Sequence, residues 1–276
     1  MNFRIGKISP MLVKTFFIFL LSLIIYSQPG YCKIMSEKLS KLTKAPKTKS
    51  PITIVLIGDS TVANYDTRST TRRGWGQLLP TLMYDEVTII NRAIPGRSSK
   101  SFIEEGAWRR VLDETRPNYV FIQFGHNDLL SKPEDRRTDP GIPLDDSTYY
   151  FRNNLHTFIN DTRRIGAIPV LITPMERRYF NSIGLIRQTN QPYAEAMRIV
   201  AREDDIHLID LQSFSVWLYE DLYQTCGATA GIELHFDNGT PERDRTHFNE
   251  SGALRYARKV LEEISPLHEL VRYRNF

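Results

Sequence analysis

The stretch Ile52-Thr53-Ile54-Val55-Leu56-Ile57-Gly58-Asp59-Ser60 decides the fold of this chain. Its first six residues are rich in Ile and Val and lack a clean apolar-polar alternation, which is typical of a parallel strand covered on both faces. A glycine and two polar residues follow at once, so the strand ends in a tight turn that carries a serine hydroxyl. Ligand sites of open parallel sheets lie beyond the carboxyl ends of the strands. The sequence therefore predicts chemistry at this turn.

Similar apolar runs recur along the chain and alternate with helical segments. The further strands are expected at Val87–Ile90, Tyr119–Phe124, Ile168–Ile172 and Ile206–Ile209, and helix-like spacing of apolar residues covers 148–165, 191–203 and 249–264, with Asn249 as an N-cap. This alternation predicts an α/β fold with three layers and right-handed crossovers. We expect a central, mainly five-stranded parallel sheet in flavodoxin-like order.

The first 50 residues differ in composition from the rest. A basic opening through Lys14 and an apolar run over residues 15–25 predict an export signal at residues 1–32. The run is short for a membrane span, and an uncleaved N-terminal anchor remains the alternative. Residues 33–50, rich in Lys, Ser and Thr, are typical of a basic linker. We therefore expect an exported protein, periplasmic or extracellular, whose folded domain covers residues 51–276.

The net charge of +4 suggests polyanion binding until the charges are located along the chain. Nine of the 36 basic residues, but only one of the 32 acidic residues, precede Pro51. The folded part is therefore acidic overall, which gives no support to a nucleic-acid-binding face. We expect no nucleic-acid partner.

Polar motifs follow the first three predicted strands, and a fourth precedes the last helix. They are Gly58-Asp59-Ser60-Thr61, Asn91-Arg92-Ala93-Ile94-Pro95-Gly96-Arg97-Ser98, Gly125-His126-Asn127-Asp128 and Asp244-Arg245-Thr246-His247. The first motif alone is a weak signal, because a serine after a strand is often a helix N-cap. All four together predict a shared site at one edge of the sheet.

In order and in spacing, these motifs resemble the SGNH hydrolases, also called GDSL esterases, whose four namesake residues match Ser60, Gly96, Asn127 and His247. The resemblance covers nearly all of residues 52–264. Within that group the chain looks most like the rhamnogalacturonan acetylesterase branch, on the strings at 58–63, 74–77, 93–98, 125–128 and 244–248. It implies an SGNH hydrolase catalytic domain that removes acetyl groups from plant cell-wall polysaccharide.

Ester cleavage by a serine hydroxyl sets the roles of these residues. Ser60 needs a base to take its proton, and His247 is suited to this, with Asp244 holding the imidazole in the correct tautomer. The resemblance implies three oxyanion donors: the backbone N–H groups of Ser60 and Gly96 and the side-chain amide of Asn127. We expect the Ser60 N–H to lie near the start of a following helix.

Residues beside the motifs are weaker candidates for substrate binding. Trp75 and Arg97 suit sugar rings and uronate carboxylates, although core packing of Trp75 and solvation of Arg97 explain them equally well. His126 is a third candidate without a defined role. Arg177 and Arg178, after the fourth predicted strand, are expected to border the site.

For the two aspartates beside the motifs we predict a structural role. Asp59 and Asp128 each adjoin an active residue in a turn, where a carboxylate commonly binds backbone N–H groups. No histidine stands at the spacing of a metal site, so we expect neither a metal nor another cofactor.

Other functions remain open. The same chemistry serves an acetylxylan esterase, a GDSL lipase or an acyl-thioesterase. A non-catalytic flavodoxin-like binding module is opposed by the lack of a glycine-rich phosphate motif in the first turn and by the presence of Asp244 and His247. We expect the partner to be an acetylated polysaccharide or oligosaccharide, the protein to be a monomer, and no membrane contact beyond a retained N-terminal anchor.

Overall fold

The structure, a computed structural model, describes residues 51–264 and 267–275. The predicted export signal at 1–32 and linker at 33–50 lie outside the described residues. Among the residues described, no helix has both the length and the apolar character that crossing a bilayer requires.

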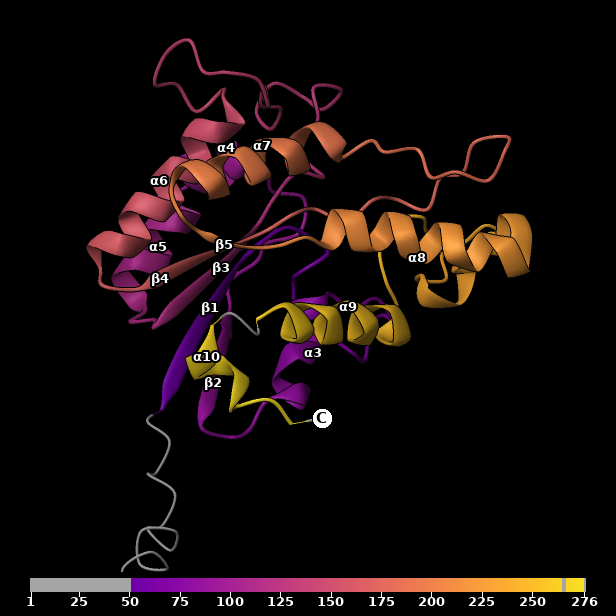
Figure 1. Ribbon diagram of the computed structural model, residues 1–276, viewed down its shortest axis with the longest axis horizontal. Coiled ribbons are helices and arrows are strands. Elements are labelled where there is room, and N and C mark those ends of the chain that lie inside the picture. Colours follow the sequence, from indigo (N-terminus) through magenta and orange to yellow (C-terminus); the bar gives the residue numbers. More distant parts are fainter. Residues whose placement is uncertain (1–50, 265–266, 276) are drawn as a thin grey trace, which may run out of the picture. The chain divides into compact units, whose positions relative to one another are not determined.

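Five parallel strands form one sheet in the order β2-β1-β3-β4-β5 (Figure 1). The strands are β1 (Ile52–Gly58), β2 (Val87–Asn91), β3 (Tyr119–Gln123), β4 (Ile168–Ile172) and β5 (His207–Ile209). The order is the flavodoxin-like one that the sequence predicts, and every predicted strand boundary lies within one residue of the observed one. The carboxyl ends of β1 and β3 are therefore neighbours at the centre of the sheet.

Helices cover both faces of the sheet (Figure 1). On one face lie α4 (Ser99–Glu104), α5 (Ala107–Glu114), α6 (Phe151–Arg164) and α7 (Gln191–Glu203), and on the other α3 (Trp75–Leu78), α8 (Leu211–Cys226), α9 (Glu250–Glu263) and α10 (His268–Val271). Short 3₁₀ turns complete the second layer at η1 (Leu79–Leu82), η2 (Gly227–Thr229) and η3 (Ile232–Leu234). The predicted three-layer arrangement is confirmed.

Strand β1 shows why the sheet must be covered on both sides. Ile54 and Leu56 belong to the core cluster under α3 and α9, whereas Val55 and Ile57 belong to the cluster under α4 to α7. None of the four is more than 1% exposed. Successive side chains of a strand point to opposite faces, so an apolar run without alternation is stable only between two helical layers.

The predicted helices differ from the observed ones at their ends. Helix α7 has the predicted bounds, while α6 and α9 are each shorter than the predicted segments. Asn249 caps α9 as expected, because its side chain accepts a hydrogen bond from the Gly252 N–H at 3.1 Å. Helices α3, α4, α5, α8 and α10 were not among the expected elements.

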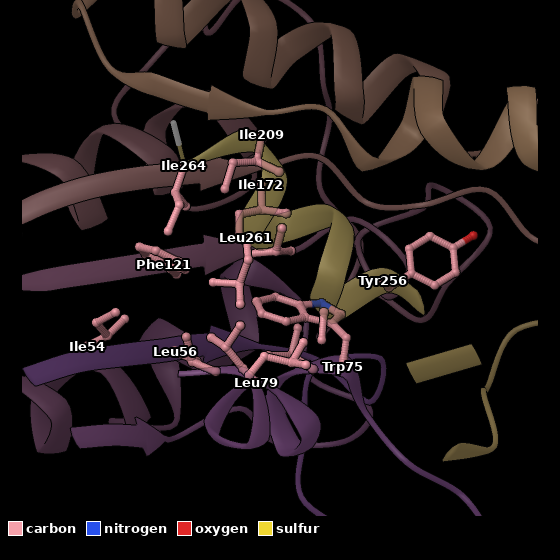
Figure 2. Close-up of a cluster of buried hydrophobic side chains, with 14 of the residues drawn as sticks. Ile54, Leu56, Trp75, Leu79, Phe121, Ile172, Ile209, Tyr256, Leu261 and Ile264 are labelled. Carbon is pink, nitrogen blue, oxygen red and sulfur yellow. The ribbon is translucent and has the colours of Figure 1, made fainter. Parts of the chain in front are cut away.

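Trp75 lies in the core and not in a groove, which corrects one of the two sequence interpretations. Its side chain is 1% exposed, and Figure 2 shows the indole among the aliphatic side chains of the cluster. The indole Nε1 donates to Gln123 Oε1 at 2.8 Å, and Gln123 Nε2 donates to Thr61 Oγ1 at 2.6 Å. Trp75 is therefore linked through Gln123 to the turn that carries Ser60, and it offers no surface to a sugar ring.

The core position of Trp75 makes a stability prediction. We expect Trp75→Ala to lower the free energy of unfolding by about 3–5 kcal/mol, because a large buried side chain leaves a cavity. The matched control is Trp217→Ala, since Trp217 is 58% exposed, and its effect should stay within about 0.5 kcal/mol. Urea unfolding of both variants measures the difference. Equally small losses would contradict the core position.

Candidate active site

Ser60, His247 and Asp244 form a hydrogen-bonded row. His247 Nε2 lies 2.9 Å from Ser60 Oγ, and His247 Nδ1 lies 2.9 Å from Asp244 Oδ2. An ionised carboxylate only accepts hydrogen bonds, so Nδ1 carries the ring proton. In the neutral imidazole Nε2 is then the acceptor, and the Ser60 hydroxyl donates to it. The sequence-predicted nucleophile, base and acid are thus brought together in the orientation that proton transfer requires.

Asp244 is fixed by its own backbone surroundings. Its Oδ1 accepts hydrogen bonds from the N–H groups of Thr246 and His247, both at 2.7 Å. Burial alone would raise the pKa of Asp244, but the hydrogen bonds from His247 and Thr246 outweigh burial and hold the pKa well below its usual range. The carboxylate is therefore ionised beside the imidazole.

His235 supports the backbone of the catalytic His247, a role that the sequence did not indicate. Its Nδ1–H donates to the His247 carbonyl at 3.1 Å, and its Nε2 lies 2.8 Å from the Tyr219 hydroxyl. Burial lowers the pKa of His235 to about 3, with the charge of Arg178 as the second cause. The ring is neutral at ordinary pH, and its two nitrogens are a fixed donor and a fixed acceptor. No spacing rule singles it out, because its partners stand 12 and 16 residues away and belong to no motif that includes it.

Ser60 stands on a single turn, and no helix begins there. The turn is closed by the N–H groups of Val62 and Ala63, which donate to the Asp59 carbonyl at 3.2 and 3.1 Å. The Thr61 carbonyl accepts from the Trp75 N–H and the Val62 carbonyl from Asn91 Nδ2. These partners replace the i+4 N–H groups that would continue a helix, so the expectation of a helix after Ser60 is wrong.

Gly58 is required for this turn. A β-carbon at Gly58 would lie 2.6 Å from the Gln123 carbonyl oxygen and 2.8 Å from a methyl group of Val62. Both contacts are closer than van der Waals packing allows, and one of them is with backbone that cannot move aside. The glycine lets β1 and the turn pass directly beside β3.

The three predicted oxyanion donors lie on linked loops. Gly96 has a φ of +80°, and a β-carbon there would meet nothing within 4 Å, so this position faces open space. Asn127 Nδ2 donates one hydrogen to the Arg97 carbonyl at 3.2 Å, which leaves its second hydrogen free. Within residues 51–264 and 267–275, the N–H groups of Ser60 and Gly96 have no protein acceptor. All three are thus available to a ligand oxygen.

A buried pair, Asp59 and His126, ties the turn after β1 to the turn after β3. His126 Nδ1 lies 3.2 Å from Asp59 Oδ2, and Asp59 Oδ1 accepts from the N–H and hydroxyl of Thr61 at 2.9 and 2.8 Å. Burial alone would raise the pKa of Asp59, but His126 and the hydrogen bonds from Thr61 lower it. His126 is 2% exposed, so the prediction that it contacts substrate is corrected to a structural role.

Asp128 fixes the base of the loop after β3. Its carboxylate accepts from Ser99 Oγ at 2.5 Å, from the Gly125 N–H at 3.0 Å and from Thr138 Oγ1 at 3.1 Å. Burial raises its pKa to about 7, against the effect of the hydrogen bonds from Ser99 and Thr138. Both Asp59 and Asp128 thus bond turn groups, as the sequence indicates.

The predicted arginines differ in their partners. Arg97 Nε lies 2.8 Å from Glu105 Oε2, so its charge is already balanced. Arg177 donates to the His126 carbonyl at 3.1 Å, and Arg178 is buried against the carbonyls of Ala228 and Glu242. Arg177 and Arg178 do border catalytic segments, as expected. For the described residues, no group of three or more His, Cys, Asp or Glu side chains is arranged to hold a metal ion.

The low pKa of Asp244 makes a pH prediction. Its folded-state pKa lies below the ordinary value of 3.8, so its stabilising contribution is fully present above that value and is lost as the pH falls further. We expect Asp244→Asn to lower the free energy of unfolding more at pH 6 than at pH 3. Urea unfolding at the two pH values measures this, and an equal loss at both would contradict an ionised Asp244.

Known proteins show the same organisation. Residues 56–255 match the model of the GDSL-like lipase/acylhydrolase family. The chain is 36% identical over 220 residues to the probable rhamnogalacturonan acetylesterase YesY of Bacillus subtilis (strain 168), which covers 78% of this chain and 93% of that protein. It is also 36% identical over 225 residues to the rhamnogalacturonan acetylesterase RhgT of the same organism, covering 79% of this chain and 92% of that protein.

Solved structures agree on the fold. The crystal structure of protein YxiM from Bacillus subtilis has a TM-score of 0.61 at 27% identity and covers 79% of this chain and 57% of that one. Axe2, an acetylxylan esterase from Geobacillus stearothermophilus, has a TM-score of 0.55 at 19% identity and covers 79% and 96% of the two chains. At that identity the second likeness shows the fold alone. The resemblance inferred from the motifs is confirmed: this chain belongs to the GDSL-like lipase/acylhydrolase family.

Proposed function

We propose that this protein is a serine esterase that removes acetyl groups from plant cell-wall polysaccharide, with acetylated rhamnogalacturonan as its substrate. The observation that carries the proposal is the row from Ser60 through His247 to Asp244, with 2.9 Å at both links. A serine hydroxyl is a weak nucleophile at neutral pH, so a base in direct contact and correctly oriented is the feature that makes it reactive.

The first half of the reaction follows from this geometry. Ser60 Oγ attacks the acetyl carbonyl carbon while its proton passes to His247 Nε2. The imidazolium that forms is stabilised by the ionised Asp244, which receives the Nδ1–H bond. The tetrahedral intermediate then collapses, His247 returns the proton to the sugar oxygen, and the acetyl group remains on Ser60. The second half repeats these steps with water as the nucleophile and releases acetate.

Negative charge on the carbonyl oxygen needs donors that are already in place. The N–H groups of Ser60 and Gly96 and the free amide hydrogen of Asn127 meet this need, because the loops that carry them are bonded together. Links between the loops include the hydrogen bonds Ile94 N–H to Gly58 carbonyl at 3.0 Å and Asn127 Nδ2 to Arg97 carbonyl at 3.2 Å. The donors therefore need little reorganisation during the reaction.

The choice of substrate is supported by the relatives. Two proteins, one named a probable rhamnogalacturonan acetylesterase and the other a rhamnogalacturonan acetylesterase, match the chain over more than nine tenths of their lengths. An acetylxylan esterase is the alternative that the fold also allows, and a lipase or acyl-thioesterase would use the same triad on longer acyl chains.

The proposal includes export to the periplasm or the exterior, where plant cell-wall polysaccharide is found, and a role in pectin degradation. Its support is the basic and apolar pattern of residues 1–32. N-terminal sequencing of protein recovered outside the cytoplasm is the direct test of cleavage.

The oxyanion assignment predicts the effect of one substitution. We expect Asn127→Ala to lower kcat on an acetyl ester by a factor that corresponds to about 3 kcal/mol of transition-state stabilisation, because one of three donors is lost. The fold should remain intact by circular dichroism. Steady-state kinetics on 4-nitrophenyl acetate measures the change, and a near-normal kcat would count against the assignment of Asn127.

The nucleophile assignment predicts the outcome of an acetate-release assay. We expect wild-type protein to release acetate from acetylated rhamnogalacturonan faster than from acetylated xylan, and Ser60→Ala to release almost none from either. 4-Nitrophenyl esters of increasing chain length serve as the control for a lipase. Equal release by wild type and Ser60→Ala would remove Ser60 as nucleophile, and a preference for long acyl chains would remove the acetylesterase function.

A further inference from the structure

Three cationic side chains lie beside the loops of the catalytic centre and take no part in the reaction described above. Arg177 Nη2 donates to the His126 carbonyl at 3.1 Å, directly before Asn127 in the chain. Arg136 Nη1 donates to the Gly96 carbonyl at 3.5 Å. Lys132 is on the same loop as Arg136. The two guanidinium groups therefore border the two loops that carry the second and third oxyanion donors.

The loop with Lys132 and Arg136 rises from a rigid base. The Thr138 N–H donates to the Asp128 carbonyl at 2.8 Å, so both ends of the loop are joined. From helix α7, the Tyr193 hydroxyl lies 2.8 Å from the Asp128 carbonyl and 2.8 Å from the Thr138 carbonyl. The loop that carries Lys132 and Arg136 is therefore held at both ends, and it starts directly after Asn127.

These charges have little internal compensation. Among the described residues, neither Lys132 nor Arg177 has a carboxylate within 4.0 Å, and Arg136 approaches only Asp135, at 3.9 Å. Burial lowers the pKa of Lys132, and the charges of Arg177 and Arg136 lower it further, while the charge of Asp59 partly offsets them. Arg97, in contrast, is paired with Glu105 at 2.8 Å.

Half-buried like charges repel one another and favour an anion between them. A carboxylate fits this need, because guanidinium groups bind carboxylates in a forked geometry and an ammonium group adds a point charge. We propose that Lys132, Arg136 and Arg177 bind the carboxylate of a uronate residue of the acetylated polysaccharide. This inference rests on the proposed function and names what separates a pectic substrate from neutral xylan.

Direct titration tests the inference without catalysis. Calorimetric titration of the Ser60→Ala protein with trigalacturonate and with xylotriose gives the two dissociation constants. We expect trigalacturonate to bind at least about tenfold more tightly than xylotriose, and Lys132→Gln, added to Ser60→Ala, to weaken trigalacturonate binding by about tenfold. Lys132 is the first choice because, within the described part of the chain, its side chain makes no hydrogen bond or ion pair that the substitution would break. Arg177→Lys, which keeps the charge but removes the fork, should give a smaller loss.

The control variant is Arg258→Gln, which removes an exposed positive charge from helix α9. It should leave both dissociation constants unchanged. Equal affinity for the two oligosaccharides, or an equal loss in Lys132→Gln and Arg258→Gln, overturns the uronate site. A loss specific to Lys132→Gln that shrinks as salt is added supports it, because the pairing is electrostatic.

A second measurement uses the active protein and separates this inference from the proposed function. The ratio of kcat/KM for acetylated rhamnogalacturonan to that for the same polymer after carboxyl reduction should exceed one and fall about tenfold in Lys132→Gln. A ratio of one in the wild type overturns the uronate site while leaving the esterase function standing. Failure to cleave any ester, 4-nitrophenyl acetate included, overturns the esterase function, and the titrations with Ser60→Ala still decide the carboxylate site.

Discussion

One hydrogen bond, from the Ser60 hydroxyl to His247 Nε2, joins two points that are 187 residues apart in the chain. Neither residue can be reactive without the other, so the whole α/β domain serves to bring them within 2.9 Å. Strand β1 fixes one end, since it is paired on both sides, with β2 and with β3. The other end is fixed by helix α9, which begins three residues after His247 and packs against the sheet. The loop itself is pinned where the Phe236 N–H donates to the His247 carbonyl at 2.9 Å.

Buried polar groups hold the turns around that bond. Asp59 joins Thr61 to His126, and Asp128 joins Ser99 to Thr138. Each carboxylate loses hydration on burial, and each is compensated by donors from turns that would otherwise be free to move. The geometry of the site thus depends on residues that adjoin the reactive ones in the sequence but do not themselves meet the substrate.

The sequence predicted what depends on local pattern. The strands follow from buried runs such as Ile52–Ile57, and the triad from motifs with fixed spacing. It did not predict the roles of side chains whose function depends on which residue they contact in the fold. Arg97 was the arginine chosen for a uronate, yet Glu105, eight residues further on at the end of helix α4, neutralises it. Among the described residues Lys132 has no carboxylate partner, and nothing in the flanking sequence indicates this. Trp75 was ambiguous because only packing decides whether an indole beside a motif faces solvent or core.

His235 has a consequence for how the site responds to acid. Its neutral ring carries one proton and one lone pair, matched to the His247 carbonyl and to the Tyr219 hydroxyl. Since burial lowers its pKa to about 3, both bonds persist through the mildly acidic range. The catalytic loop therefore keeps its support from His235 and Tyr219 when the surroundings turn mildly acidic, because neither contact depends on a group that gains a proton in that range.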